Sequence, residues 1–184
     1  GIGKSTLLKI LMDEVTADCG SVEWGYETHP GYFAQDNSEF FLGEEDVQAW
    51  LWNRFPSETL GSIRSRLGAV LFSQDDVDKR VVALSGGEKA RLVFCMLGIM
   101  RPNVLVLDEP TNHLDLEGIE ALCKGLESYE GTLLFVSHNR WFVEKLATRV
   151  VELSVDGVFD CKGTYADYVA LKRVDHLDSE QVLA

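Results

Sequence analysis

The sequence is poor in cysteine and lacks any long apolar run. Four cysteines occur in 184 residues, and none of them shows the C-x-x-C spacing of a metal or redox motif. Scattered cysteines of this kind are typical of free thiols in a reducing compartment, so we expect the protein to be cytoplasmic. No stretch of 18 consecutive apolar residues is present, which excludes a membrane-spanning helix in this sequence.

Basic residues are also scarce. Lysine and arginine together number 17 against 30 aspartates and glutamates, and the formal net charge is -13. Because nucleic-acid phosphates are held mainly by lysine and arginine, this excess of acid argues against direct nucleic-acid binding by this chain. A hydrophobic content of 46% is nevertheless ordinary for a globular domain, and the length allows one core of normal size.

The segment from Leu84 to Asp115 combines two features that suit a nucleoside triphosphate. Ser85 and Glu88 form an S-x-x-E capping box, which alone most often marks only a helix start. The successive glycines Gly86 and Gly87 need another explanation, because a glycine inside a helix costs about 1 kcal/mol relative to alanine. They suit a helix start that a ligand approaches closely, since the N–H groups there bind phosphate oxygens.

Two carboxylates follow at the end of an expected strand. Residues 104–107 are continuously apolar, as in a parallel strand covered on both faces, and Pro110 stops the pairing. Asp108 and Glu109 therefore stand where ligands bind in open α/β sheets. An acid in this place can hold Mg²⁺ and a second can activate water, although an isolated Asp-Glu pair is most often a solvated turn.

The first six residues decide between these readings. They spell GIGKST, the end of a phosphate-binding loop of the form G-x-x-x-x-G-K-[ST]. In such a loop Gly3 lets the backbone wrap the phosphates, Lys4 reaches the β- and γ-phosphates, and the Ser5 hydroxyl ligates Mg²⁺. The first glycine of the loop, and the strand that leads into it, would lie before Gly1.

Taken together, these motifs resemble the ATP-binding cassette ATPases, and more narrowly their ABC-F subfamily. The resemblance extends from Gly1 to about Lys172. It rests on GIGKST (Walker A), GYFAQD (Q-loop), LSGGEKARL (signature), VLVLDEP (Walker B), NHLD (D-loop) and SHNRWF (switch-histidine region). Glutamate rather than glutamine at position 88, the Asn112-His113 pair and the G-x-Y-x-x-Y segment at 163–168 favour ABC-F over a transporter cassette. The FSQDD element at 72–76 is similar to the YbiT-like branch.

The resemblance implies a role for each matching residue. Asp108 would hold Mg²⁺ through water, Glu109 would be the general base, and His138 would hold the γ-phosphate. Gln35 would contact both Mg²⁺ and the attacking water. One ATP would be bound by Gly1, Gly3, Lys4, Ser5 and Thr6. The ATP of an opposing cassette would contact Ser85, Gly86, Gly87 and Glu88. Asp115 is also expected among the nucleotide-binding residues.

Two of these assignments have simpler alternatives when taken alone. Gln35 by itself is most often a strand-end residue, and His138 an ordinary histidine at a helix start that Ser137 caps. His113 is expected to be structural or a contact between domains, not a metal ligand. Nothing around His29 or His176 indicates a function. Only the joint order of the motifs assigns Gln35 and His138 to a site.

The expected fold is α/β, a P-loop NTPase of the ABC ATPase type. It has a parallel core sheet, an antiparallel β subdomain and a helical signature subdomain, and it lacks the strand before the phosphate loop. We expect an ATP-binding domain over residues 1–172, with a helical arm at about 44–100, and a tail over 173–184. The expected strands are 21–24, 31–34, 104–107, 132–136, 150–153 and 158–160, the last pair joined by a turn at Asp156-Gly157.

The missing strand would lie between the strands at 132–136 and 150–153, and the aromatic residue that stacks on adenine would also precede Gly1. Ladder hydrogen bonds left unmade in a sheet cost about 1–3 kcal/mol each, against a net stability of about 5–15 kcal/mol. We therefore expect the 184-residue chain alone to aggregate and to bind ATP weakly.

Three functional readings remain at this point. The first is an ABC-F ATPase acting on the ribosome, with a second cassette in the same polypeptide and rRNA contacts outside this acidic segment. This cassette would be the second of the two, because residues 175–184 do not resemble a charged linker helix. The second reading is the nucleotide-binding subunit of an ABC transporter, with a membrane partner near the helical arm. The third is a non-hydrolysing scaffold, which the intact Lys4, Asp108, Glu109 and His138 argue against.

Overall fold

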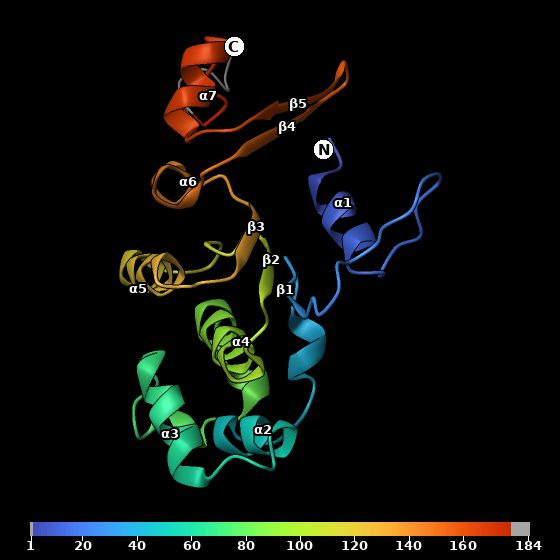
Figure 1. Ribbon diagram of the computed structural model, residues 1–184. Helices are drawn as coiled ribbons and strands as arrows, with labels where there is room; N and C mark the ends of the chain where they lie inside the picture. The colour runs from blue at the N-terminus through green and yellow to red at the C-terminus, as the bar shows by residue number, and fades with distance from the viewer. Residues whose placement is uncertain (1, 178–184) are drawn as a thin grey trace.

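Three parallel strands form the centre of the computed structural model, which describes residues 2–177 (Figure 1). They are β1 (Pro30–Phe33), β2 (Val104–Asp108) and β3 (Thr132–Val136), and their order in the sheet is β1-β2-β3. The middle strand β2 is buried on both faces from its second residue onward, as its continuous apolar sequence predicts. The parallel core sheet is therefore confirmed.

Helices cover the two faces of this sheet. Helix α1 (Lys4–Leu11) lies on one side of the strands, and α5 (Leu116–Glu127) and α6 (Arg140–Leu146) lie on the other (Figure 1). Each of α5 and α6 begins at a side-chain cap, Asp115 for the first and Asn139 for the second. The βαβ connections thus bring the loops after β2 and β3 to the same edge of the sheet.

The helical arm forms one end of the molecule together with α4 (Gly86–Met100) (Figure 1). Its two helices are α2 (Val47–Arg54) and α3 (Leu60–Ala69), capped by the side chains of Asp46 and Thr59. Short 3-10 turns occupy Ser38–Phe41, Asp76–Asp78 and Val81–Ala83. The arm packs on α4 through the main hydrophobic core, so it supports the start of that helix.

Trp50 is the largest fully buried side chain of the arm, and its removal should unfold the arm locally. Its indole Nε1 donates to the Phe40 carbonyl at 2.8 Å, and its ring stacks on Phe41. Truncating a buried tryptophan costs about 3–5 kcal/mol, so Trp50→Ala should greatly accelerate amide hydrogen exchange in α2 and α3. Trp52 on the same helix is 43% exposed, so Trp52→Ala is the matched control. Equal exchange in the two variants would contradict the packing described here.

The C-terminal part of the described chain is a hairpin followed by a helix. Strands β4 (Val150–Ser154) and β5 (Gly157–Cys161) pair in antiparallel fashion around the expected turn, and α7 (Tyr165–Lys172) follows. A second, smaller core of buried side chains joins this unit to α6. Its buried members are Val143, Ala147, Cys161, Tyr165 and Tyr168.

The run 21–24 and the free edge of β3 bear on two expectations about the sheets. The run 21–24 was expected as a strand but is irregular and exposed, since no neighbouring strand in the described chain supplies hydrogen bonds for it. The place expected for a strand beside β3 is open within residues 2–177: β3 pairs only with β2, and Leu134 is 37% exposed. Gly1 and residues 178–184 lie outside the described chain, so the expectations for them are untested.

Three of the four free cysteines are buried and only Cys19 is exposed. Burial raises the pKa of the Cys95 thiol to about 12, as expected for a cysteine inside the apolar α4. Within the described residues, every helix is too short or too polar to cross a bilayer.

Candidate nucleotide site

The phosphate loop and the tip of β2 meet in the structure. The Ser5 hydroxyl donates a hydrogen bond of 3.1 Å to Asp108 Oδ1, across 103 residues of sequence. Gly3, just before α1, has φ +95°, a left-handed conformation that residues with a Cβ rarely adopt. The N-terminus of α1 therefore lies beside the carboxyl end of the central strand, where an anion and a cation can be held together.

Asp108 is suited to a hard cation. Its side chain is fully buried, and its Oδ2 has no hydrogen-bond partner among the described residues. Burial, and then the negative charge of Asp108, raise the pKa of the Tyr32 phenol on β1 to about 12. A buried, unpaired carboxylate oxygen next to a serine hydroxyl is the donor set that Mg²⁺ prefers.

A complete protein cage for a metal is absent within residues 2–177, because no group of three histidine, cysteine or acidic side chains converges there. This agrees with magnesium chemistry in nucleotide sites, since Mg²⁺ keeps several waters and takes further oxygens from phosphates. The Ser5 and Asp108 oxygens thus fit part of a Mg²⁺ coordination sphere.

Glu109 and His138 form a second contact at the same strand edge. Glu109 Oε2 accepts from the backbone N–H of His138 at 3.0 Å, and Glu109 Oε1 lies 3.3 Å from His138 Nε2. The carboxylate is 7% exposed whereas the imidazole is 72% exposed. Glu109 itself has φ +50°, and its N–H donates to the Val136 carbonyl at 2.8 Å. The strained backbone and the two bonds aim the carboxylate along the edge toward the loop after β3.

Two hydroxyl side chains outside the expected site support this loop. The hydroxyls of Thr111 and Ser137 lie 3.3 Å apart and join the loops after β2 and β3. In the simpler alternative for His138, Ser137 caps the following helix. In the structure Asn139 does so, accepting from the Phe142 N–H at 3.0 Å. Ser137 instead accepts from the Asn139 N–H at 3.1 Å, so both residues fix His138 between them.

The signature segment has the expected capping box. Ser85 Oγ accepts from the Glu88 N–H at 3.3 Å, and Glu88 Oε2 accepts from the Ser85 N–H at 2.8 Å. Lys79 Nζ adds a bond of 2.9 Å to Glu88 Oε1. Burial raises the pKa of Glu88, but the bonds from Ser85 and Lys79 outweigh it, so the pKa lies below its usual value. The first turn of α4 thus carries an ionised carboxylate.

A polar hollow of about 520 Å³ opens at this helix start. The D-loop contributes His113, and it also contributes Asp115, whose Oδ1 caps α5 by accepting from the Gly118 N–H at 2.9 Å. Arg91, which lies within the signature motif but was given no role, also lines the hollow one helical turn beyond the glycines. The lining residues are Ser85, Gly86, Gly87, Glu88, Arg91, His113 and Asp115.

The expected site residues therefore fall into two groups. Ser5, Asp108, Glu109 and His138 are joined at the edge of the sheet, and the signature and D-loop residues surround the hollow. Within residues 2–177 no hydrogen bond joins the two groups. Gln35 is exposed two residues past the end of β1, and among residues 2–177 its side chain bonds to neither group.

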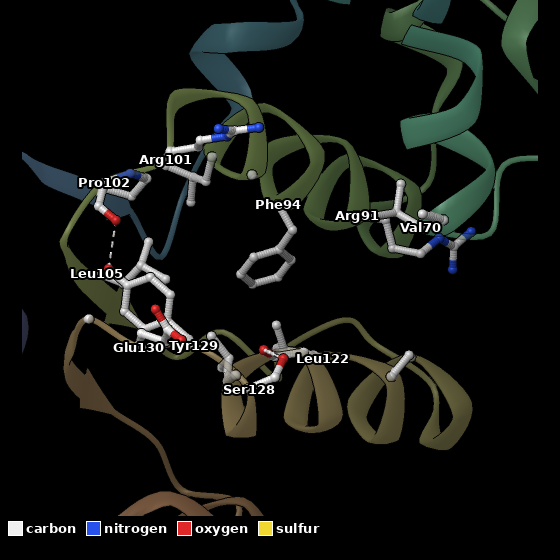
Figure 2. A pocket seen from close by; sticks show the side chains of 18 of the residues that line it. Val70, Arg91, Phe94, Arg101, Pro102, Leu105, Leu122, Ser128, Tyr129 and Glu130 are labelled. Carbon is white, nitrogen blue, oxygen red and sulfur yellow. Dashed lines mark hydrogen bonds between the residues drawn. The ribbon is translucent and has the colours of Figure 1, made fainter. Parts of the chain in front are cut away.

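A second cavity, apart from these two groups, lies between two helices. It measures about 790 Å³ and separates α4 from α5, with Phe94 and Leu122 facing each other across it (Figure 2). Tyr129 closes one end, where its hydroxyl donates to the Pro102 carbonyl at 2.8 Å. The lining is mainly apolar and includes none of the expected site residues.

Comparison with known proteins settles the family. Residues 1–112 match the family described as ABC transporter. The chain belongs to this family. It is 46% identical over 177 residues to the probable ATP-binding protein YbiT of Escherichia coli O157:H7, covering 95% of this chain and 33% of that protein. It is 38% identical over 176 residues to ABC transporter F family member 2 of Arabidopsis thaliana, covering 95% and 26%.

These matches confirm the resemblance to the ABC-F subfamily, whose Arabidopsis thaliana member 5 is also 38% identical over 170 residues. The chain spans only about a third of the length of the relatives it matches, or less. Solved structures agree in fold. The RNase-L inhibitor superposes with a TM-score of 0.71 at 24% identity, covering 92% of this chain and 35% of that one.

A second solved structure holds the archaeal ribosome recycling factor aABCE1 in complex with the ribosomal stalk protein aP1. It has a TM-score of 0.72 at 23% identity, covering 93% and 34%. At these identities the likeness shows the fold, and it confirms the P-loop ABC ATPase architecture.

Proposed function

We propose that this cassette binds ATP with Mg²⁺ and hydrolyses it to ADP and phosphate. The observation that carries the proposal is the meeting of Ser5 with Asp108 and of Glu109 with His138 at one edge of the sheet. Phosphoryl transfer needs positioning and charge neutralisation more than covalent chemistry, and these four side chains supply the groups for both. Membership of the ABC transporter family supports ATP as the nucleotide.

Each residue of this cluster has a part in the proposal. Gly1, Gly3, Lys4 and Thr6 bind the phosphates, and Ser5 and Asp108 hold Mg²⁺, which neutralises phosphate charge when it is bound. Gln35 completes the site from the neighbouring strand. Glu109 takes the proton of the attacking water on its carboxylate. His138, exposed and in contact with Glu109, donates to the γ-phosphate and keeps that carboxylate in place.

The signature and D-loop residues around the hollow bind the nucleotide of a second cassette. The hollow at the start of α4 offers backbone N–H groups of Gly86 and Gly87 and the guanidinium of Arg91, a combination suited to phosphate oxygens. No bond joins it to Asp108 or Glu109 within the described chain, so it is free to act on a partner. We propose that the partner cassette lies in the same polypeptide, since the relatives are about three times as long.

We further propose that the full-length protein works on the ribosome in the cytoplasm. The support is the similarity to ABC-F proteins at 38–46% identity and the fold shared with a ribosome recycling factor. The net charge of -13 supports the proposal that any rRNA contact is made by other parts of the polypeptide.

Sedimentation tests this role. The full-length protein, loaded with a non-hydrolysable ATP analogue, should comigrate with ribosomes on a sucrose gradient and leave them when ADP replaces the analogue. Lys4→Ala, which removes the phosphate-binding ammonium, is the control and should stay at the top of the gradient under both conditions. Co-purification with membrane-spanning subunits, and no comigration with ribosomes, would instead indicate a transporter subunit.

A further inference from the structure

The loop that carries His138 leads into α6, and an ion pair holds the start of this helix. Arg140 is the first residue of α6, two positions after His138. Its guanidinium donates through Nε to Glu144 Oε1 at 2.8 Å and through Nη1 to Asp175 Oδ2. Asp175 lies 35 residues away in the sequence, beyond the end of α7. The bond therefore connects the start of α6 to the segment that follows α7.

Asp175 is itself firmly placed. Its Oδ1 accepts from the Tyr165 hydroxyl at 2.8 Å and from the Leu177 N–H at 3.1 Å, and its side chain is only 12% exposed. Tyr165 is 4% exposed and stacks on Tyr168 in the second core. Burial, then the bond to Asp175, raise the pKa of Tyr165 to about 12. A partly buried ion pair on a fixed carboxylate restrains Arg140 more than an exposed pair does.

The restraint on Arg140 also affects Glu109, through His138. His138 touches the Glu109 carboxylate both through its backbone N–H and through its ring, so a displacement of the first turn of α6 moves both contacts. Figure 1 shows α6 beside α7. The path from Asp175 to Glu109 thus consists of two side-chain contacts and two peptide units.

We propose that Arg140 and Asp175 are positioning residues for His138, so that the segment after α7 sets the geometry of the hydrolytic centre. This inference rests on the proposed function, because it gives Glu109 and His138 their parts in ATP hydrolysis. It adds that residues 173–177, which belong to no motif, are coupled to the hydrolytic centre.

Steady-state ATP hydrolysis by the full-length protein tests the coupling. Arg140→Gln and Asp175→Asn should each lower kcat by about three- to tenfold, because small misplacements of reacting groups are costly, and leave KM for ATP within about twofold. Arg149→Gln is the matched control. It breaks an Arg–Asp pair of 2.7 and 2.8 Å with Asp160 on the hairpin, which does not touch His138, and it should keep the wild-type rate.

A double-variant comparison separates positioning from a general structural effect. If Arg140 acts through His138, then His138→Ala combined with Arg140→Gln should be no slower than His138→Ala alone. Losses that multiply, or an Arg140→Gln rate equal to that of Arg149→Gln, overturn the proposal. Glu109→Gln in the same assay tests the proposed function separately: a wild-type rate there refutes the base, whatever Arg140 does.

Discussion

Glu109→Gln should reduce ATP hydrolysis by the full-length protein at least about a hundredfold and leave ATP bound. General base catalysis contributes roughly a hundred- to ten-thousandfold to such reactions, and an amide cannot accept the proton. The substitution is nearly isosteric, and the amide oxygen can still accept from the His138 N–H that now lies 3.0 Å from Glu109 Oε2. The loop after β3 should therefore keep its position while the chemistry stops.

Two measurements check this result. Phosphate release gives the rate, and the nucleotide content of the purified variant after gel filtration shows whether ATP stays bound in a closed state. Glu120→Gln, an exposed glutamate on α5, removes the same charge away from the site and should match the wild type. Phosphate release by Glu109→Gln within a few-fold of the wild type would show that another group accepts the proton.

Much of the fold could be predicted because its signals are local. The capping box at Ser85, the apolar run of β2 and the turn at Asp156-Gly157 each depend on a few adjacent residues, and the structure has all three. The run 21–24 shows the limit of this reasoning. Its residues favour a strand, but a strand exists only when a neighbour pairs with it, and no local pattern states which neighbour is present.

The contacts of the candidate site were harder to predict from the sequence. The order of the motifs brought Ser5, Asp108 and His138 into one hypothesis, yet the bond from Glu109 to the His138 backbone depends on a left-handed Glu109 that no sequence rule indicates. The pairing of Arg140 with Asp175 was also not predicted. Charged residues 35 positions apart follow no periodic pattern, so only the packing of α6 on α7 shows that they meet.

The glycines of the signature illustrate the same limit. The reason that glycine is needed at these positions differs in part from the expected one. They were predicted to let a ligand approach the backbone. In the structure the D-loop backbone already does so: a Cβ added at Gly87 would lie 2.8 Å from the His113 carbonyl oxygen, and one at Gly86 would lie 3.1 Å from His113 Cβ. At least one glycine is thus required by contact within this chain before any second nucleotide binds.

Gly87→Ala should therefore lower the stability of the full-length protein by about 1–3 kcal/mol, the usual cost of overpacking, because the opposing atom belongs to the backbone. It should also slow ATP hydrolysis at least about tenfold, since the signature turn and the D-loop must separate. Gly98→Ala, in the same helix, adds the same methyl group where nothing lies within 4 Å and should stabilise by about 0.5–1 kcal/mol. Unfolding curves and phosphate release measure both effects. If Gly87→Ala loses hydrolysis but keeps the wild-type stability, then the approach of a nucleotide, and not the D-loop, is the reason for glycine at this position.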